Sequence, residues 1–445
     1  MSTPMADPVA DRTHVPPVLD IAELIDARPI GAFQRLLLAV IAAVIVMDGF
    51  DVQVIGFLAP AIVRDWGLEP AALGPIFSAG LFGMLIGAMV LGTVADRIGR
   101  RPVLIGATLL FGAGMLASAA AADPAQLMAA RFVTGLGLGG VMGNAVALAS
   151  EFSPARRRAT VLMTLSCGFT GGAIAGGLVS AVLVPVAGWR AVFVVGSLIP
   201  LAIGLLMWRF LPESLPFALA RGRGVDVLAR LAPGIDPRDI RAPAPVAHRG
   251  SVAGLFGAGR GLATVVLWAI AFANLLNLFF LSSWLPTLAA RMALGAQVPI
   301  LLGTTLQLGG IVGALAMGPL MDRYGFRGVM MAGFALATIA IALIGRPGLP
   351  LPALVALVAM AGVGVVGAQP AINTVAAWLY PTELRGTGIG WCLGIGRVGA
   401  IVGPLVAAVL IARHWSNADL FLVAAAPAAL ACLLVWWLGS LVPRR

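Results

Sequence analysis

Long apolar stretches dominate this chain and set the pattern of its secondary structure. Twelve of them each hold about 20 mostly apolar residues, the length that an α-helix needs to cross a bilayer, and polar segments separate them. They lie near residues 36–60, 73–95, 102–121, 126–150, 159–185, 190–211, 262–286, 298–320, 328–345, 351–378, 387–411 and 418–438. The pattern predicts an all-α membrane protein with twelve transmembrane helices.

The longest polar segment divides the twelve helices into two groups of six. Residues 212–260 are rich in Pro, Gly and Arg, which is typical of a linker. We expect an N-terminal six-helix bundle over residues 31–211 and a C-terminal six-helix bundle over residues 261–440. Residues 1–30 and 441–445 then form tails, and the first tail lacks the basic start and apolar run of a cleavable signal.

Composition and charge placement agree with a membrane protein. Of the 445 residues, 60% are hydrophobic and 11% are charged, against about 45–50% and about 25% in soluble domains. The net charge of +10 suggests nucleic acid at first, but its placement indicates a lipid bilayer instead. With the N-terminus inside, 22 of 29 basic residues fall on the cytoplasmic side. The positive-inside rule therefore predicts cytoplasmic N- and C-termini in a bacterial inner membrane.

Two polar patterns recur at nearly one offset along the chain. Gly92–Arg101 follows the second apolar stretch, and the similar Gly318–Arg327 follows the eighth, at an offset of 226 in sequence number. A Pro-x-x-x-Arg pattern that ends at Arg158 recurs at an offset of 227 and then ends at Arg385. The offsets predict two pseudo-repeat halves, an architecture of secondary transporters whose substrate site lies near the bilayer midplane between them.

These motifs resemble those of a known family. Gly92–Arg101 is similar to the loop signature of the major facilitator superfamily, and Asp48-Gly49-Phe50-Asp51 resembles the DGxD motif of its aromatic acid/proton symporters. Further matches are Arg131–Gly137, Glu151, Pro381–Thr387 and Gly396–Pro404. The resemblance covers the chain except its tails and central linker.

The resemblance implies a fold and a function. The fold is that of the major facilitators, and a monomer is enough for it. The function is proton-coupled import of a small aromatic carboxylate, of the hydroxybenzoate or benzoate type, by alternating access. The proton gradient would supply the energy, so no cofactor is expected.

Ionisable side chains at membrane depth point to the coupling chemistry, since each costs about 2.5–3.5 kcal/mol to insert. Asp51 lies 16 residues beyond Arg35, or about 24 Å along a helix, and Arg131 reaches a similar depth from the opposite side. We therefore expect Asp51 to pair with Arg131, with Asp48 about one turn deeper. Asp48, Asp51 and Arg131 are predicted to couple transport to protons. The alternative is a permanent ion pair that only joins the first and fourth spans.

Arg397 is the candidate for binding the substrate anion. It lies about 15 Å into the eleventh span, near the midplane, where the second half offers no acid. A guanidinium fork binds a carboxylate through two parallel hydrogen bonds. The alternative is a gate residue bonded to backbone carbonyls near the cytoplasmic mouth. The side chains expected to complete the site are Gln53, Asn144, Asn277, Gln307 and Trp391.

Charged residues at the cytoplasmic ends of the spans form a further set. Those of the first half are Asp96, Arg97, Arg100, Arg101, Glu151 and Arg158, and those of the second half are Asp322, Arg323, Glu383 and Arg385. Such clusters can close a cytoplasmic gate in one conformation and open it in another. The alternative, loops held inside by positive charge, explains the arginines but leaves the matched Asp residues without a role.

Other functions remain as alternatives. Transport of another organic anion, such as a sugar acid, fits the same charges. Drug/proton efflux is disfavoured, because the fifth span lacks the Gly-Pro pair usual in such antiporters. An enzyme is not expected, since the chain has three histidines, all outside the clear spans, and neither a metal-binding pattern nor a phosphate-binding loop. A receptor without transport would give the matched gate clusters no purpose.

Overall fold

The computed structural model describes residues 19–20, 25–26, 30–221, 240–241, 252–292, 295 and 297–441. Most of the expected linker and of both expected tails lies outside this part of the chain. The described residues are almost all helical, which confirms the predicted fold class. The strands among them are Leu19–Asp20 (β1) and Ile240–Arg241 (β2), which pair in parallel.

The first half consists of five long helical segments. They are α2 (Ala32–Trp66), α3 (Leu73–Ile98, preceded by the 3-10 turn η1, Pro70–Ala72), α4 (Arg100–Ala120), α5 (Pro124–Glu151) and α6 (Ala155–Phe210). The second half follows the short helices α7 (Leu215–Ala220) and α9 (Val252–Leu255). It consists of α10 (Gly261–Ala290), α11 (Val298–Tyr324), α12 (Phe326–Ile344), α13 (Leu351–Val365), α14 (Ala368–Leu379), α15 (Thr382–Ala412) and α16 (Asn417–Leu441).

The twelve expected spans correspond to eleven helical segments that are long and apolar enough to cross a membrane in the described part of the chain. The difference lies in α6, whose 56 residues would extend about 84 Å, far beyond a bilayer. Its helical geometry breaks at Gly188, where φ is 76° and ψ is 173°. A residue without a Cβ adopts this conformation readily. The segment therefore holds the fifth and sixth spans.

The tenth span is a broken helix. Helix α13 ends at Val365, and α14 begins at Ala368 after a turn in which the amides of Val366 and Gly367 both donate to the carbonyl oxygen of Gly362. Gln369 follows directly, and its side-chain oxygen accepts a hydrogen bond from Asn274 of α10 at 2.9 Å. Irregular backbone at membrane depth is tolerated where protein or a water-filled cavity surrounds it.

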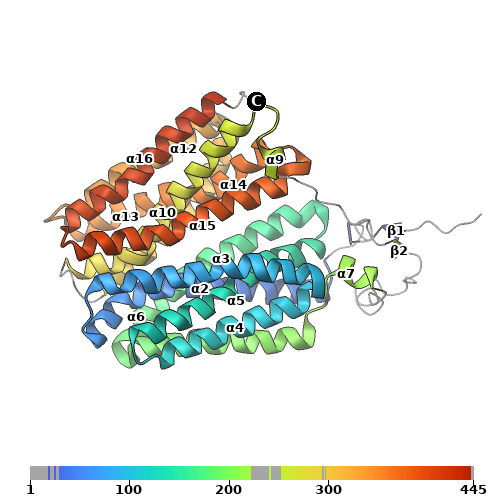
Figure 1. Ribbon diagram of the computed structural model, residues 1–445, viewed down its shortest axis with the longest axis horizontal. Helices are drawn as coiled ribbons and strands as arrows, with labels where there is room; N and C mark the ends of the chain where they lie inside the picture. Colours follow the sequence, from blue (N-terminus) through green and yellow to red (C-terminus); the bar gives the residue numbers. More distant parts are fainter. Residues whose placement is uncertain are drawn as a thin grey trace, which may run out of the picture.

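The helices form two bundles that lie side by side (Figure 1), with α2–α6 in one and α10–α16 in the other. The bundles meet mainly through α3 with α15, α2 with α10, and α6 with α11. The Ser78 hydroxyl donates to the carbonyl oxygen of Ile401 at 2.9 Å, and the rings of Phe77 and Trp284 pack edge to face. These contacts lie near the start of α3 and in the second half of α10 and α15. The bundles diverge toward the opposite end, where α7 and α9 lie.

The internal repeat is visible in the backbone. Gly99 joins α3 to α4 with φ of 106°, and Gly325 joins α11 to α12 with φ of 77°. The sequence numbers of the two glycines differ by 226, which is the offset of the motifs that contain them. Both turns need a positive φ, so each half keeps a glycine at this point.

Candidate functional site

The middle of α2 carries both acidic residues of the first span. Asp48 and Asp51 are three residues apart, and both side chains are buried. Gly49 between them packs directly on the carbonyl of Phe169 in α6, and a Cβ at this position would collide with that backbone. The glycine of the DGFD segment thus lets α2 and α6 approach closely, which keeps both carboxylates away from lipid.

Asp51 and Arg131 form the ion pair that the depth argument predicts. The two guanidinium nitrogens Nη1 and Nη2 of Arg131 each donate to one carboxylate oxygen of Asp51 at 2.7 Å. Neither side chain is more than 4% exposed, and the guanidinium also lies 5.7 Å from the ring centre of Phe193. The pairing is confirmed, and its part in proton transfer stays a prediction. Removing one partner of such a buried pair leaves an uncompensated charge.

Asp48 has a different environment from Asp51. Its side chain is fully buried, and neither carboxylate oxygen has a hydrogen-bond partner among the described residues. The charges that act on it are those of Arg397 in the other bundle and of Asp51 on its own helix. A buried carboxylate without donors is costly when it is ionised. Asp48 is therefore suited to accept a proton.

Arg397 reaches across from α15 to the first bundle. Its Nη1 donates to the carbonyl oxygen of Met84 in α3 at 3.1 Å, and its charge acts on Asp48. The sequence pattern had offered substrate binding and carbonyl bonding as alternatives. In the structure Arg397 bonds to a backbone carbonyl, but this carbonyl lies in the middle of α3 and not at the end next to Gly99, where the cytoplasmic mouth was expected. In the described part of the chain Arg397 has no ion pair within hydrogen-bonding distance, and apart from the bond to Met84 its guanidinium retains N–H groups that can bind a carboxylate.

The structure brings two of the predicted substrate-binding side chains together. Gln53 of α2 and Gln307 of α11 both donate from Nε2 to the hydroxyl of Ser282 in α10, at 3.4 Å and 3.5 Å. Ser282 is a polar contact that the sequence analysis missed, because a lone Ser in an apolar span is not distinctive. The three residues join the two bundles at the buried interface.

The other three predicted side chains make contacts of their own. Asn144 donates to the carbonyl oxygen of Gly140 one turn earlier in α5, and Asn277 donates to that of Ala424 in α16. The ring of Trp391 stacks on Trp268 of α10 with centres 5.7 Å apart. None of these contacts is with Arg397 or Asp48. Their role in substrate binding remains a prediction.

A small cavity adjoins the ion pair. Arg131, Met84, Phe279 and Ser283 are among its lining residues, and its volume is about 20 Å³. That space suffices for about one water molecule and is far too small for a benzoate. A substrate therefore needs the bundles to move before it can contact the Arg131 side of the site.

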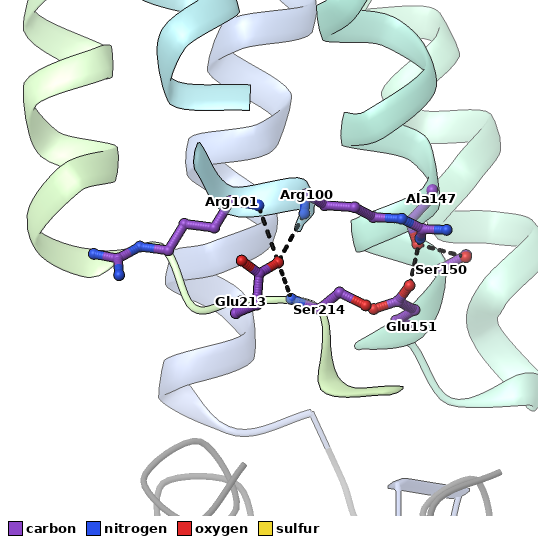
Figure 2. A network of polar contacts seen from close by, with 7 residues as sticks. All are labelled: Arg100, Arg101, Ala147, Ser150, Glu151, Glu213 and Ser214. Carbon is purple, nitrogen blue, oxygen red and sulfur yellow. Dashed lines mark hydrogen bonds and ion pairs between the residues drawn. The ribbon is translucent and has the colours of Figure 1, made fainter. Parts of the chain in front are cut away.

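Three gate residues of the first half, Arg100, Arg101 and Glu151, take part in a polar network around the start of α4 (Figure 2). Arg100 forms an ion pair with Glu151 at the end of α5. The Glu213 carboxylate accepts hydrogen bonds from the backbone amides of Arg100, Arg101 and Ser214 at 2.8, 3.1 and 2.8 Å. An acidic side chain on the free amides of a helix N-terminus is stabilising. Glu213 thus caps α4.

Sequence reasoning missed Glu213. The available signal was an acidic residue next to Pro212 at the end of the sixth span, which lies 113 residues after the amide of Arg100. A helix cap that comes from so far along the chain leaves no local pattern. The equivalent position of the second half, at the repeat offset of 226, is Gly439. The second half therefore has no acidic residue at the position that corresponds to Glu213.

The other gate residues are dispersed. Arg101 Nη2 donates to the carbonyl oxygen of Trp208, and Arg158 Nη2 donates to that of Ser153. The residues of this set that are exposed are Asp96, Arg97, Asp322, Arg323 and Arg385. The side chain of Glu383 lies outside the described residues. No ion pair joins the gate residues of the two halves in the described part of the chain, and the gate role remains a prediction.

Comparison with known proteins identifies the family. The family model described as the Major Facilitator Superfamily matches residues 41–295 and residues 267–445. The 4-hydroxybenzoate transporter PcaK of Pseudomonas putida is 38% identical over 421 residues, which are 93% of this chain and 94% of that protein. The chain belongs to the major facilitator superfamily, in its family of aromatic acid transporters. It is a multi-pass membrane transporter, as its sequence predicts, and not an enzyme.

Other relatives and solved structures agree with this assignment. The gallate transporter of Pseudomonas putida is 38% identical to this transporter over 431 residues, 94% of this chain and 96% of that one. Among solved structures, a bacterial homologue of the lysosomal transporter Spinster, described as inward-facing and unoccupied, has a TM-score of 0.73 at 16% identity. The structural match covers 92% of this chain and 98% of the Spinster homologue. The xylose transporter XylE of E. coli, described as inward open, has a TM-score of 0.71 at 17% identity. The match covers 93% of this chain and 97% of XylE. These two structures share the fold.

Proposed function

We propose that this transporter imports a small aromatic carboxylate, of the hydroxybenzoate or benzoate type, together with protons across a bacterial inner membrane. Its relatives support the substrate class, since they are named for transport of 4-hydroxybenzoate, gallate and benzoate. The arginine distribution along the chain supports cytoplasmic termini. A monomer that draws on the proton gradient, without a cofactor, is sufficient for this activity.

The observation that carries the proposal is the charge balance at the site. The charges of Asp48, Asp51, Arg131 and Arg397 sum to zero when all four are ionised. Asp51 and Arg131 neutralise one another through two short hydrogen bonds. Asp48 and Arg397, from opposite bundles, are the remaining acid and base. An isolated charge is costly at membrane depth, so the carrier moves readily only when this sum is near zero.

Binding of a substrate carboxylate to Arg397 would bring the sum to −1. One proton on Asp48 restores it to zero and also removes the competitor for the guanidinium of Arg397. The loaded carrier therefore holds both substrate and proton. The empty carrier holds neither, because ionised Asp48 then balances Arg397. These two neutral states couple uptake of the anion to uptake of one proton.

Import then follows from alternating access of the two bundles. In the outward-facing state Asp48 takes a proton and Arg397 binds the substrate carboxylate. The bundles then rock about their interface, and the proton and the substrate are released on the cytoplasmic side. Phe77 and Phe279 line the small cavity beside Arg131, and their rings are candidates to contact a substrate ring.

The test is uptake of radiolabelled 4-hydroxybenzoate into proteoliposomes under an imposed inward proton gradient. Accumulation is expected for the unmodified protein and for the control Arg413→Gln, which changes an exposed arginine at the end of the same helix. Arg397→Gln should abolish both accumulation and exchange, because the one remaining cation of the site, Arg131, is already paired with Asp51. No accumulation of any aromatic acid by the unmodified protein would overturn the substrate class and direct attention to sugar acids and other organic anions.

A further inference from the structure

Two open cavities lie at the ends of the bundles nearest the Gly99 and Gly325 turns. The first, of about 710 Å³, lies between the start of α4, the end of α6 and α7, and its lining includes Arg101, Arg209 and Arg221. The second, of about 890 Å³, lies between the ends of α11, α14 and α16 and the start of α12, and its lining includes Arg323 and Arg327. Neither includes the central charges, so the transport site does not account for them.

The cavities are counterparts under the internal repeat. Adding 226 to Ile98, Arg101, Pro102, Ile105, Phe210 and Glu213 of the first cavity leads to Tyr324, Arg327, Gly328, Met331, Trp436 and Gly439 of the second. Arginine and an aromatic ring thus recur at matched positions. Each half of the protein builds the same kind of hollow at the same level of its bundle.

Four of the cavity arginines stack on aromatic rings that line the same cavities. In the first, the guanidinium carbon of Arg209 lies 5.3 Å from the ring centre of Phe210, and that of Arg221 lies 4.2 Å from Phe217. The matching distances in the second are 5.2 Å for Arg323 with Tyr324 and 5.5 Å for Arg327 with Trp436. Arg221 Nη2 also donates to the carbonyl oxygen of Arg97 at 2.6 Å. Stacking on a ring occupies the face of a guanidinium and leaves its other edge N–H groups for an anion.

These arginines are not neutralised by acids. In the described part of the chain none of the four forms an ion pair. Glu213 in the first cavity accepts hydrogen bonds from three backbone amides, and in the second cavity Asp322 is the one acid in a lining that includes Arg323 and Arg327. Both cavities therefore keep a net positive charge. Phosphate oxygens suit an arginine fork particularly well.

The surroundings indicate an amphiphile and not a free ion. Trp208 and Trp436 at the cavity rims are 65% and 53% exposed, and Leu205 and Leu433 one turn further into the spans are 63% and 66% exposed. Exposed aromatic rings at the ends of spans are typical of the headgroup level, and the leucines face the acyl chains. Basic pockets between transmembrane helices bind anionic headgroups. We propose that each cavity binds the phosphate headgroup of one anionic glycerophospholipid.

The experiment is native mass spectrometry of the full-length protein in neutral detergent, titrated with phosphatidylglycerol. The comparison ligands are phosphatidylcholine with the same acyl chains and inorganic phosphate. Arg209→Gln/Arg221→Gln tests the first cavity, and Arg327→Gln tests the second. The control Arg35→Gln/Arg157→Gln changes two exposed arginines near the starts of α2 and α6 that line neither cavity.

The unmodified protein and the control should bind two phosphatidylglycerol molecules tightly. One arginine near an anionic headgroup contributes about a fivefold gain in affinity, so the Arg209/Arg221 double variant should bind the first lipid about thirtyfold more weakly. Arg209→Lys/Arg221→Lys, which keeps the charges, should retain most of the binding and exclude a folding defect as the cause. Equal binding of phosphatidylcholine, unchanged binding by the glutamine variants, or ready displacement by inorganic phosphate would each overturn the proposal.

Discussion

Replacing Asp48 with Asn tests the proposed coupling most directly. The substitution keeps the shape of the side chain and removes its ability to ionise. Because neither oxygen of Asp48 has a hydrogen-bond partner among the described residues, no hydrogen bond is lost and the protein should fold. The neutral amide resembles the protonated state of the carboxyl, so Arg397 is free to bind substrate. The empty variant, in contrast, carries the unbalanced positive charge of Arg397. This charge should slow the return of the empty carrier to its outward-facing state.

The expected magnitude follows from the charge balance. A pH difference of one unit is worth about 1.4 kcal/mol per proton, so neutral symport of one anion with one proton accumulates substrate about tenfold. The Asp48→Asn variant should accumulate none under the same gradient. It should still exchange external labelled substrate for internal unlabelled substrate, since exchange needs only the loaded state.

The assay uses proteoliposomes with 4-hydroxybenzoate, and the control is Asp65→Asn at the exposed end of the same helix, where Asp65 pairs with Arg190. A membrane potential gives a second check. One proton per anion moves no net charge, whereas a second proton would add about 2.3 kcal/mol per 100 mV, or about fiftyfold more accumulation. Tenfold accumulation by Asp48→Asn would refute the role of Asp48, and a strong response to the potential would refute the one-proton balance.

Two further predictions concern stability. Asp51→Asn and Arg131→Gln should each cost about 3–5 kcal/mol by leaving a buried charge unpaired, and the double variant should cost less than their sum, as measured by chemical unfolding in detergent; additive losses would mean that the pair is not coupled. Gly325→Ala should cost about 1–3 kcal/mol for its positive φ alone, while Gly99→Ala should cost more because its Cβ meets the carboxylate of Glu213. Equal thermal shifts for the two glycine variants would contradict the capping role of Glu213.

The hydrophobic pattern was enough to predict the fold class. Lipid cannot satisfy backbone hydrogen bonds, so the spans must be helices of about 20 apolar residues. Each such run can be recognised in the sequence without knowledge of the others. The pattern also separated the two spans of α6, since the break at Gly188 lies between the expected stretches 159–185 and 190–211. The repeat offset in the sequence predicted two pseudo-repeat halves, and the matching positive-φ turns at Gly99 and Gly325 show the repeat in the backbone.

The pairing of Asp51 with Arg131 was also predictable from the sequence. Depth in the membrane is a linear function of residue number along a straight helix, because every residue adds the same rise. Two opposite charges at equal depth in neighbouring spans have a strong reason to meet, because each alone is costly. The structure places them in a bidentate pair.

Contacts that depend on helix rotation and on distant segments were decided by the tertiary structure alone. Neighbouring residues point about 100° apart around a helix, so depth does not determine whether Trp391 faces a substrate or stacks on Trp268. The bond from Arg397 to Met84 and the cap of α4 by Glu213 join residues 313 and 113 positions apart. The local sequence pattern predicts burial and depth, because the polarity of each residue matches the lipid, protein or water around it. It does not predict partners, because a partner is determined by how whole helices pack.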